Sequence, residues 1–148
     1  MQTVATNRKA RHDFEILETI ETGLVLTGTE VKSVRLGRVS LKESYAGFKG
    51  NEAYIYNMHI APYEQGNRYN PDPKRTRKLL LHRQEISRLL GRITEKGLTL
   101  IPISLYFKKG NAKLELGLAK GKKLYDRREQ IKKRIMQREV ERSFRGKN

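Results

Sequence analysis

Apolar and polar residues alternate over several short segments of this chain, and a period of two residues is typical of half-buried β-strands. The clearest run is Ala112–Ala119, in which three leucines fall on one face. Tyr45–Tyr56 reads as strand, turn and strand, because Gly50-Asn51 is a two-residue hairpin signal. Phe14–Leu26 is predicted to form a hairpin or two short strands, with a turn at Thr22-Gly23. Further strands are predicted in Lys78–His82 and in Leu98–Phe107, and Pro102 places an edge or a bulge in the second of these.

Two segments show a helical period instead. Apolar residues recur on one helix face in Arg83–Lys96, and the following Gly97 is a typical helix terminator. A shorter helix is predicted between Thr29, which can cap its start, and Gly37, which can end it. Ala61–Pro73 has no regular period and contains three Pro, one Gly and two Asn, so we interpret it as a loop.

Together these elements predict a mainly β protein: an OB-like closed antiparallel β-barrel of about six strands, with two or three short helices. Barrels of this type commonly bind nucleic acid through one face and their loops. Composition divides the chain into a basic N-terminal arm over residues 1–12, the barrel over 13–119, and a basic C-terminal tail over 120–148.

Positive charge is concentrated at the C-terminal end. The chain has a formal net charge of +16, and its last 29 residues hold 12 Lys or Arg against 4 Asp or Glu, which gives this tail +8. Such a segment cannot bury enough apolar surface to fold alone, and a polyanion is its natural partner. Because the rest of the chain is also basic, nucleic acid is favoured over the alternative of a merely solubilising tail.

The tail also has a helical pattern, and two interpretations of it stay open. In one, it is a latent amphipathic helix that is disordered alone and becomes helical when its charges are neutralised. In the other, it is a permanent helix docked through one apolar face. The apolar residues that carry the pattern are Leu124, Ile131, Ile135, Met136, Val140 and Phe144.

Other classes of protein are disfavoured. Cysteine is absent, the N-terminus lacks the apolar core of a secretory signal, and no apolar run is long enough for a membrane span, so we expect a cytoplasmic protein. No metal, phosphate-loop or serine-nucleophile motif occurs, so we expect no catalytic residue, metal or cofactor. A metal-free ribonuclease using His12 with Asp13, or using His59, is the enzymatic alternative, although a structural histidine is favoured.

Five short motifs then follow one another along the chain: Asn7–Phe14, Gly28–Arg35, Asp72–His82, Leu105-Tyr106 and Gly121–Arg128. In this order and spacing they resemble the SmpB family of bacterial SsrA-binding proteins, from Asn7 to about Phe144. The resemblance implies a non-enzymatic RNA chaperone of trans-translation. Such a protein binds the tRNA-like domain of tmRNA and delivers it to ribosomes stalled on truncated messages, so that incomplete proteins are tagged for degradation.

The resemblance also implies a division of work. The barrel would grip the elbow of the tRNA-like domain, and the tail would enter the decoding centre and the empty mRNA channel of the small ribosomal subunit. Alanyl-tRNA synthetase and elongation factor Tu would act on the same RNA, and the protein would be a monomer. A ribosomal or assembly protein that binds rRNA is the alternative, and a requirement for tRNA-like RNA would separate the two.

The RNA contacts of the family can be transferred position by position. Four positions implicated in binding the tRNA-like domain correspond to Asn7, Glu21, Leu80 and Lys113. Glu21 suits this role because a carboxylate accepts from a base amino group, which Lys and Arg cannot do; an ordinary exposed glutamate is the alternative. Leu80 would pack on an unstacked base, unless it belongs to the core. Phosphate contacts are expected from Arg8, Lys9, Arg75, Arg77 and Lys78.

The ribosome-binding residues implied by the resemblance all lie in the tail. Its first residues would form a hinge into the ribosomal site, the next would enter the decoding centre, and a later basic group would continue along the channel. In chain order these three groups are Gly121, Lys122 and Lys123; Tyr125, Asp126, Arg127 and Arg128; and Lys132, Lys133 and Arg134.

Overall fold

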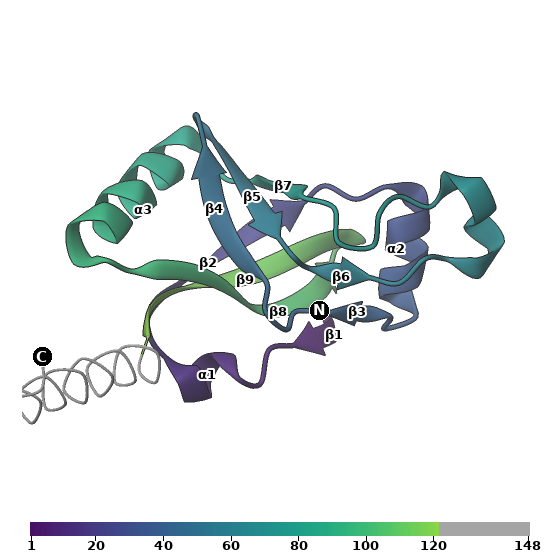
Figure 1. Ribbon diagram of the computed structural model, residues 1–148, viewed down its shortest axis with the longest axis horizontal. Coiled ribbons are helices and arrows are strands. Elements are labelled where there is room, and N and C mark those ends of the chain that lie inside the picture. The colour runs from purple at the N-terminus through teal and green to yellow at the C-terminus, as the bar shows by residue number, and fades with distance from the viewer. Residues whose placement is uncertain (122–148) are drawn as a thin grey trace, which may run out of the picture.

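Strands make up more of the described chain than helices do. The computed structural model (Figure 1) describes residues 1–121, without the side chains of residues 67 and 68, so the predicted tail from residue 122 onward lies outside the described residues. The elements in chain order are β1 (Gln2–Thr6), α1 (Ala10–Asp13), β2 (Phe14–Leu24), α2 (Gly28–Arg35), β3 (Val39–Ser40), β4 (Tyr45–Lys49), β5 (Glu52–Tyr56), β6 (His59–Ile60), the 3-10 helix η1 (Glu64–Tyr69), β7 (Arg77–Leu80), α3 (Arg83–Lys96), β8 (Thr99–Lys108) and β9 (Asn111–Gly121).

Six of the strands form a closed ring. Its order is β8-β4-β5-β7-β2-β9, and β9 pairs back with β8. Each of these pairs is antiparallel, and β1 extends the sheet by pairing with the second half of β8. The strands β3 and β6 form a separate two-stranded sheet. The prediction of a mainly β protein with about six antiparallel strands and a few short helices is therefore confirmed, whereas the OB-like barrel stays a prediction.

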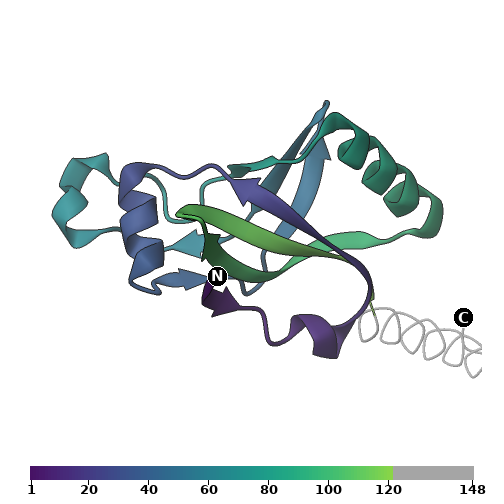
Figure 2. The same ribbon diagram turned by 180° about the vertical axis from the view of Figure 1, so that it is seen from behind.

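Three long strands, β2, β8 and β9, carry the ring. β2 and β9 pair along nearly their whole length, and they run side by side when the molecule is seen from behind (Figure 2). β8 and β9 are joined by the two-residue turn Lys109-Gly110, in which both residues have a positive φ. The predicted irregularity at Pro102 is confirmed, because the pairing of β8 with β9 shifts between Pro102 and Ser104. The proline, which has no N–H to donate, thus lies at a bulge.

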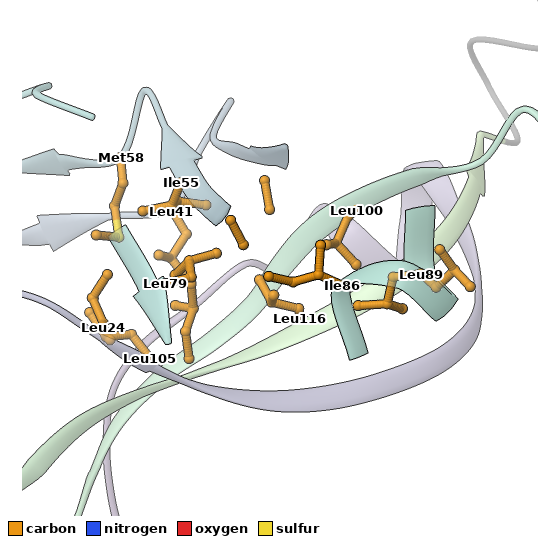
Figure 3. Close-up of a cluster of buried hydrophobic side chains, with 14 of the residues drawn as sticks. Leu24, Leu41, Ile55, Met58, Leu79, Ile86, Leu89, Leu100, Leu105 and Leu116 are labelled. Carbon is orange, nitrogen blue, oxygen red and sulfur yellow. The ribbon is translucent and has the colours of Figure 1, made fainter. Parts of the chain in front are cut away.

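Side chains that alternate inward along the strands fill the ring. The three leucines of β9 predicted to share a face are all buried in the core. The predicted helix α3 is confirmed, and it ends at Gly97 in a left-handed conformation with φ 61°. Figure 3 shows Ile86 and Leu89 of α3 beside Leu100 and Leu116, so this helix closes the core on one side.

The turn predicted at Thr22-Gly23 is wrong, because β2 continues through both residues as one strand. Gly23 marks the point where β2 changes neighbour: it lies opposite Lys113 of β9 and also opposite Leu80 of β7. A Cβ atom on Gly23 would lie 3.0 Å from Cδ1 of Leu80. The glycine therefore admits a neighbouring side chain and does not turn the chain.

Residues 1–12 do not form an arm separate from the sheet. β1 pairs with β8 from Gln2 opposite Phe107 to Thr6 opposite Ser104, and α1 begins at Ala10, which is buried. The second half of β8 would otherwise leave the backbone groups of this edge without a partner strand. Backbone pairing thus outweighs the polar composition from which the arm was predicted.

Two local predictions near α2 are also corrected. The helix is capped by Thr27 and not by Thr29: Oγ1 of Thr27 accepts a hydrogen bond from the Glu30 N–H at 3.3 Å, and the Thr27 N–H donates to Oε1 of Glu30 at 2.9 Å. This reciprocal capping box explains why the helix starts earlier than predicted. The predicted loop Ala61–Pro73 contains the 3-10 helix η1.

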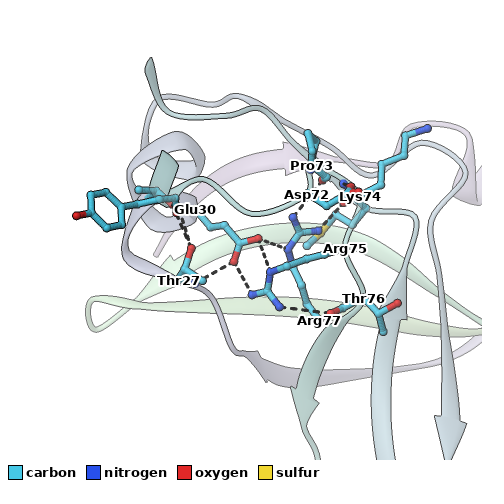
Figure 4. Close-up of polar contacts among 11 residues, drawn as sticks. Thr27, Glu30, Asp72, Pro73, Lys74, Arg75, Thr76 and Arg77 are labelled. Carbon is cyan, nitrogen blue, oxygen red and sulfur yellow. Dashed lines mark hydrogen bonds and ion pairs between the residues drawn. The ribbon is translucent and has the colours of Figure 1, made fainter. Parts of the chain in front are cut away.

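A buried ionic cluster joins α2 to β7 and to the segment before it (Figure 4). Arg77 is fully buried, and its Nε donates to Oε2 of Glu30 at 2.6 Å. Its other two nitrogens donate to the carbonyl oxygens of Met58, at 2.5 Å, and Pro73, at 3.1 Å. Arg75 adds a two-pronged pair to the same carboxylate, with Nε at 3.0 Å and Nη2 at 2.6 Å. One carboxylate therefore holds two guanidinium groups and a helix N-terminus.

The charge state of Glu30 follows from these contacts. Burial by itself raises its pKa, but the hydrogen bonds from Arg75, from the Thr27 N–H and from Arg77 outweigh burial, so the pKa is lowered from 4.5. Burial lowers the pKa of Arg77, and the Glu30 carboxylate opposes that shift. The Glu30 carboxylate is therefore ionised at neutral pH.

We expect Glu30→Gln to lower the free energy of unfolding by about 3–5 kcal/mol at neutral pH, because it leaves a buried guanidinium without its counter-ion. Glutamine keeps the size and can still complete the capping box, so the variant removes mainly the charge. Because the pKa of Glu30 is lowered in the folded protein, its stabilisation is complete above pH 4.5 and is lost as the pH falls through the folded value. Urea unfolding over a pH series should show the two proteins converging in acid.

Glu52→Gln is the matched control, because Glu52 pairs with Lys78 at an exposed position, with 3.0 Å between Oε1 and Nζ. Exposed ion pairs contribute little, so this control should unfold almost as the parent does. A Glu30→Gln variant as stable as the parent, or a gap that persists unchanged in acid, would contradict this account of the cluster.

Candidate nucleic-acid interface

The register of the ring brings predicted RNA-binding residues together on its outer face. Leu80 of β7 lies opposite Gly23 of β2, Gly23 lies opposite Lys113 of β9, and Lys113 lies opposite Tyr106 of β8. Glu21 comes two residues before Gly23 on the same strand, and therefore points to the same face. We call Glu21, Leu80, Tyr106, Lys108 and Lys113 the outer patch.

Leu80 is a surface residue. It is 57% exposed, whereas the preceding Leu79 is 1% exposed and belongs to the core. The side chain of Leu80 leans over Gly23, whose missing Cβ leaves room for it. The alternative that Leu80 belongs to the core is therefore wrong, and an apolar side chain is presented next to charged ones.

Glu21 is held at the surface by two side chains of β8. The hydroxyl of Tyr106 donates to its Oε2, and Nζ of Lys108 lies 3.6 Å from its Oε1. The hydrogen bond from Tyr106 is the main reason that the pKa of Glu21 is lowered, and the charges of Lys108 and Lys113 act in the same direction. An ionised, partly exposed carboxylate thus lies within a basic surface.

Asn7 has a structural task. Its Nδ2 donates to the carbonyl oxygen of Pro102 at 3.0 Å, and its backbone N–H donates to that of Ile103 at 2.7 Å. These bonds fix the chain between β1 and α1 to β8. The next two residues, Arg8 and Lys9, are exposed, so Asn7 fixes the segment that carries these two predicted phosphate contacts.

The predicted phosphate contact of Arg77 is wrong, because this residue is 0% exposed and its guanidinium is bonded within the protein. Arg75 is half-buried, and both nitrogens of its pair with Glu30 are directed inward. Lys78 is exposed and makes a surface pair with Glu52, which is weak enough to be exchanged for a phosphate. Within Arg75–Lys78, the two arginines are therefore paired inside the protein, and the lysine is exposed at the surface.

Of the predicted tail residues, Gly121 is described and ends β9, and the others lie outside the described residues. Gly121 borders a groove of about 770 Å³. Phe14 and Ile101 contribute apolar surface to it, and its lining also includes Lys9, Lys42, Lys96 and Lys120. The end of the described chain thus lies at a second basic surface.

Other functional groups are sparse in residues 1–121. Nδ1 of His12 lies 3.1 Å from Oδ1 of the neighbouring Asp13 on the surface, and this pair was the candidate for ribonuclease chemistry. No group of three or more His, Asp or Glu side chains in this part of the chain could hold a metal ion. None of the described helices is long and apolar enough to span a membrane.

Tyr106, Lys108 and Glu115 were not identified as members of this face from the sequence. A signal was available: once Lys109-Gly110 is accepted as a two-residue turn, Lys108 pairs with Asn111 and Tyr106 with Lys113. Since Leu105 and Phe107 point into the core, Tyr106 must point outward. The register of this hairpin thus leads from the motif Leu105-Tyr106 to the neighbourhood of Lys113.

Comparisons with known proteins identify the family of this chain. The family described as SmpB protein matches residues 4–146. The SsrA-binding protein of Acetivibrio thermocellus is 63% identical over 141 residues, which cover 95% of this chain and 92% of the relative. That of Carboxydothermus hydrogenoformans is 60% identical over 144 residues, covering 97% of each chain.

A solved structure shows the same similarity. It is described as "tmRNA-SmpB: a journey to the center of the bacterial ribosome", and it superposes with a TM-score of 0.67 at 56% sequence identity, covering 80% of this chain and 83% of the other. The fold and the outer patch define a basic protein built on a ring of antiparallel strands. The chain belongs to the SmpB protein family.

We expect Leu80→Ala to change the free energy of unfolding by less than about 1 kcal/mol, because the side chain is mostly exposed. The neighbouring Leu79→Ala, which opens a cavity in the core, should cost about 2–5 kcal/mol. Chemical denaturation of both variants would check the assignment. A large loss for Leu80→Ala would show that this residue supports the core.

Proposed function

We propose that this protein binds the tRNA-like domain of tmRNA and delivers it to stalled ribosomes in trans-translation. The observation that carries the proposal is the register that brings Glu21, Leu80 and Lys113 onto one outer face of β7, β2 and β9. Membership of the SmpB family and the similarity to SsrA-binding proteins support it.

The chemistry of the outer patch suits a folded RNA with exposed bases. Lys108 and Lys113 attract phosphates, Leu80 offers an apolar surface to an unstacked base, and the Glu21 carboxylate accepts hydrogen bonds from base amino groups. The acidic residue distinguishes this surface from a merely basic one. Its carboxylate repels phosphates, whereas it accepts hydrogen bonds from a base edge that lies opposite it. We therefore assign specificity to Glu21 and Leu80, and affinity to the lysines.

In this proposal the ring is an OB-like barrel that grips the elbow of the tRNA-like domain, and the protein acts as a cytoplasmic monomer without enzymatic activity. The tail from Gly121 onward occupies the decoding centre and the mRNA channel of the small subunit. Alanyl-tRNA synthetase and elongation factor Tu act on the same RNA. The position of Gly121 at the end of β9, beside the basic groove, supports a tail that leaves the body on a different side from the outer patch.

The direct test is a gel shift with the tRNA-like domain of tmRNA in the presence of excess bulk tRNA at physiological salt. Bound complex that survives the competitor supports the proposal, because counterion release alone does not distinguish between RNAs. Binding that bulk tRNA abolishes would overturn it and would favour a general rRNA-binding protein.

We expect Glu21→Ala to weaken binding of the tRNA-like domain by about tenfold, the effect of losing one charge-assisted hydrogen bond. Its melting temperature should stay close to that of the parent, since Glu21 lies at the surface. Glu15→Ala, which removes another exposed glutamate from β2, is the matched control and should bind as the parent does. A Glu21→Ala variant that melts much earlier would instead assign a structural role to this residue.

Deletion of the chain from Leu124 onward should leave the affinity for the tRNA-like domain nearly unchanged and abolish tagging on stalled ribosomes. The reason is that the outer patch belongs entirely to the body. Binding is measured by gel shift, and tagging is measured in a reconstituted translation reaction on a truncated message. Loss of RNA binding in this truncation would contradict the division of work between body and tail.

A further inference from the structure

Tyr106 has an unusual position for a residue on the outer face. It lies between Leu105 and Phe107, which point into the core, yet it is only 5% exposed. Its hydroxyl donates to Oε2 of Glu21, and β9 lies between the strands of the two residues. The tyrosine side chain therefore spans a whole strand to reach the carboxylate.

The groups around the Glu21 carboxylate come from two neighbouring strands. β8 contributes the Tyr106 hydroxyl and the Lys108 ammonium, which is 3.6 Å away. β9 contributes Lys113 and also Glu115, which lies directly opposite Glu21 in the register. Tyr106 is the one buried neighbour in this group and is fixed by its surroundings, whereas the lysines are long and flexible.

We infer that Tyr106 is a positioning residue for RNA recognition: its hydroxyl holds the Glu21 carboxylate at the surface as an acceptor for a base N–H group of tmRNA. This inference rests on the proposed function. It adds a residue that does not itself contact the RNA and acts only through Glu21.

The chemistry favours this arrangement. A carboxylate has four lone-pair positions, and the Tyr106 hydroxyl occupies one of them, so others are left for a ligand. Without the tyrosine, Glu21 would sample several rotamers, and ordering it on binding would reduce the affinity. The same hydrogen bond lowers the pKa of Glu21. Burial raises the pKa of Tyr106 and the hydrogen bond adds to that shift, so the carboxylate stays charged and the phenol stays a donor.

Tyr106→Phe removes only the hydroxyl, and Glu21→Gln removes only the charge. Binding of a fluorescent tRNA-like domain is measured by anisotropy for the full-length parent, both single variants and the double variant, at a temperature at which circular dichroism shows each to be folded. We expect Tyr106→Phe to weaken binding by about fivefold to tenfold, the effect of one hydrogen bond. In the Glu21→Gln background the same change should have almost no further effect, because the two residues act as one unit.

A second readout separates positioning from general structural support. The carboxyl carbon of Glu21 is titrated by NMR in the parent and in Tyr106→Phe. We expect the pKa of Glu21 to rise in the variant, since the lost hydrogen bond is the main cause of its lowering. A residue that only fills space would leave this titration unchanged.

Tyr54→Phe is the matched control. The hydroxyl of Tyr54 donates to Oε2 of Glu52 at 2.6 Å, and this bond lowers the pKa of Glu52, so the same pair of groups occurs on β5, outside the outer patch. The control should raise the pKa of Glu52 and leave RNA binding unchanged.

Two results would overturn the inference: Tyr106→Phe binding as tightly as the parent, or Tyr106→Phe weakening binding by the same factor with and without Glu21. A failure of the proposed function looks different. In that case the parent itself shows no preference for the tRNA-like domain over bulk tRNA, whatever the variants do.

Discussion

The antiparallel pairing of β2, β9 and β8 is the constraint on which the rest of the structure depends. These three strands carry the longest registers, each interrupted by one shift, and β9 is paired on both sides. Because side chains alternate along a strand, one register directs the leucines of β9 into the core and directs Lys113 and Glu115 outward. A slip by one residue would exchange the two faces, so the core and the outer patch are specified together.

The buried ionic cluster around Glu30 explains how basic residues are divided. Glu30 holds Arg75 and Arg77, and through them fixes α2 and the chain around Pro73 against β7. Arg75 and Arg77, which were both predicted as phosphate contacts, thus make their ion pairs within the protein. A positive net charge therefore indicates a polyanionic partner, but only the Lys and Arg side chains that are exposed can contact that partner.

Much of the fold could be predicted where one local signal dominates. The alternation in β9, the Gly50-Asn51 turn and the helix closed by Gly97 are local patterns, and each was confirmed. The turn at Gly23 is a wrong prediction, because glycine occurs both in turns and in strands. The close approach of the Leu80 side chain, which explains this glycine, is not visible in the sequence. The N-terminal strand was missed since its residues are polar and its stability comes from pairing with β8.

The interface was harder to predict because its residues come from separate parts of the chain. Glu21, Leu80 and Lys113 were named from the resemblance to a family, but the sequence alone could not show that they share a face. Arg77, predicted as a phosphate contact, is buried, whereas Leu80, for which the core was the alternative, is exposed. Long-range register decides both cases, and it is not visible in local hydropathy.

NMR mapping of the backbone amides during titration with the tRNA-like domain of tmRNA would locate the RNA-binding face. We predict that signals of β7, β2 and β9 around Leu80, Gly23 and Lys113 shift or broaden first, while those of α3 stay in place. Shifts confined to α3 and the residues around it, with the outer patch unchanged, would contradict the assignment of this face to RNA.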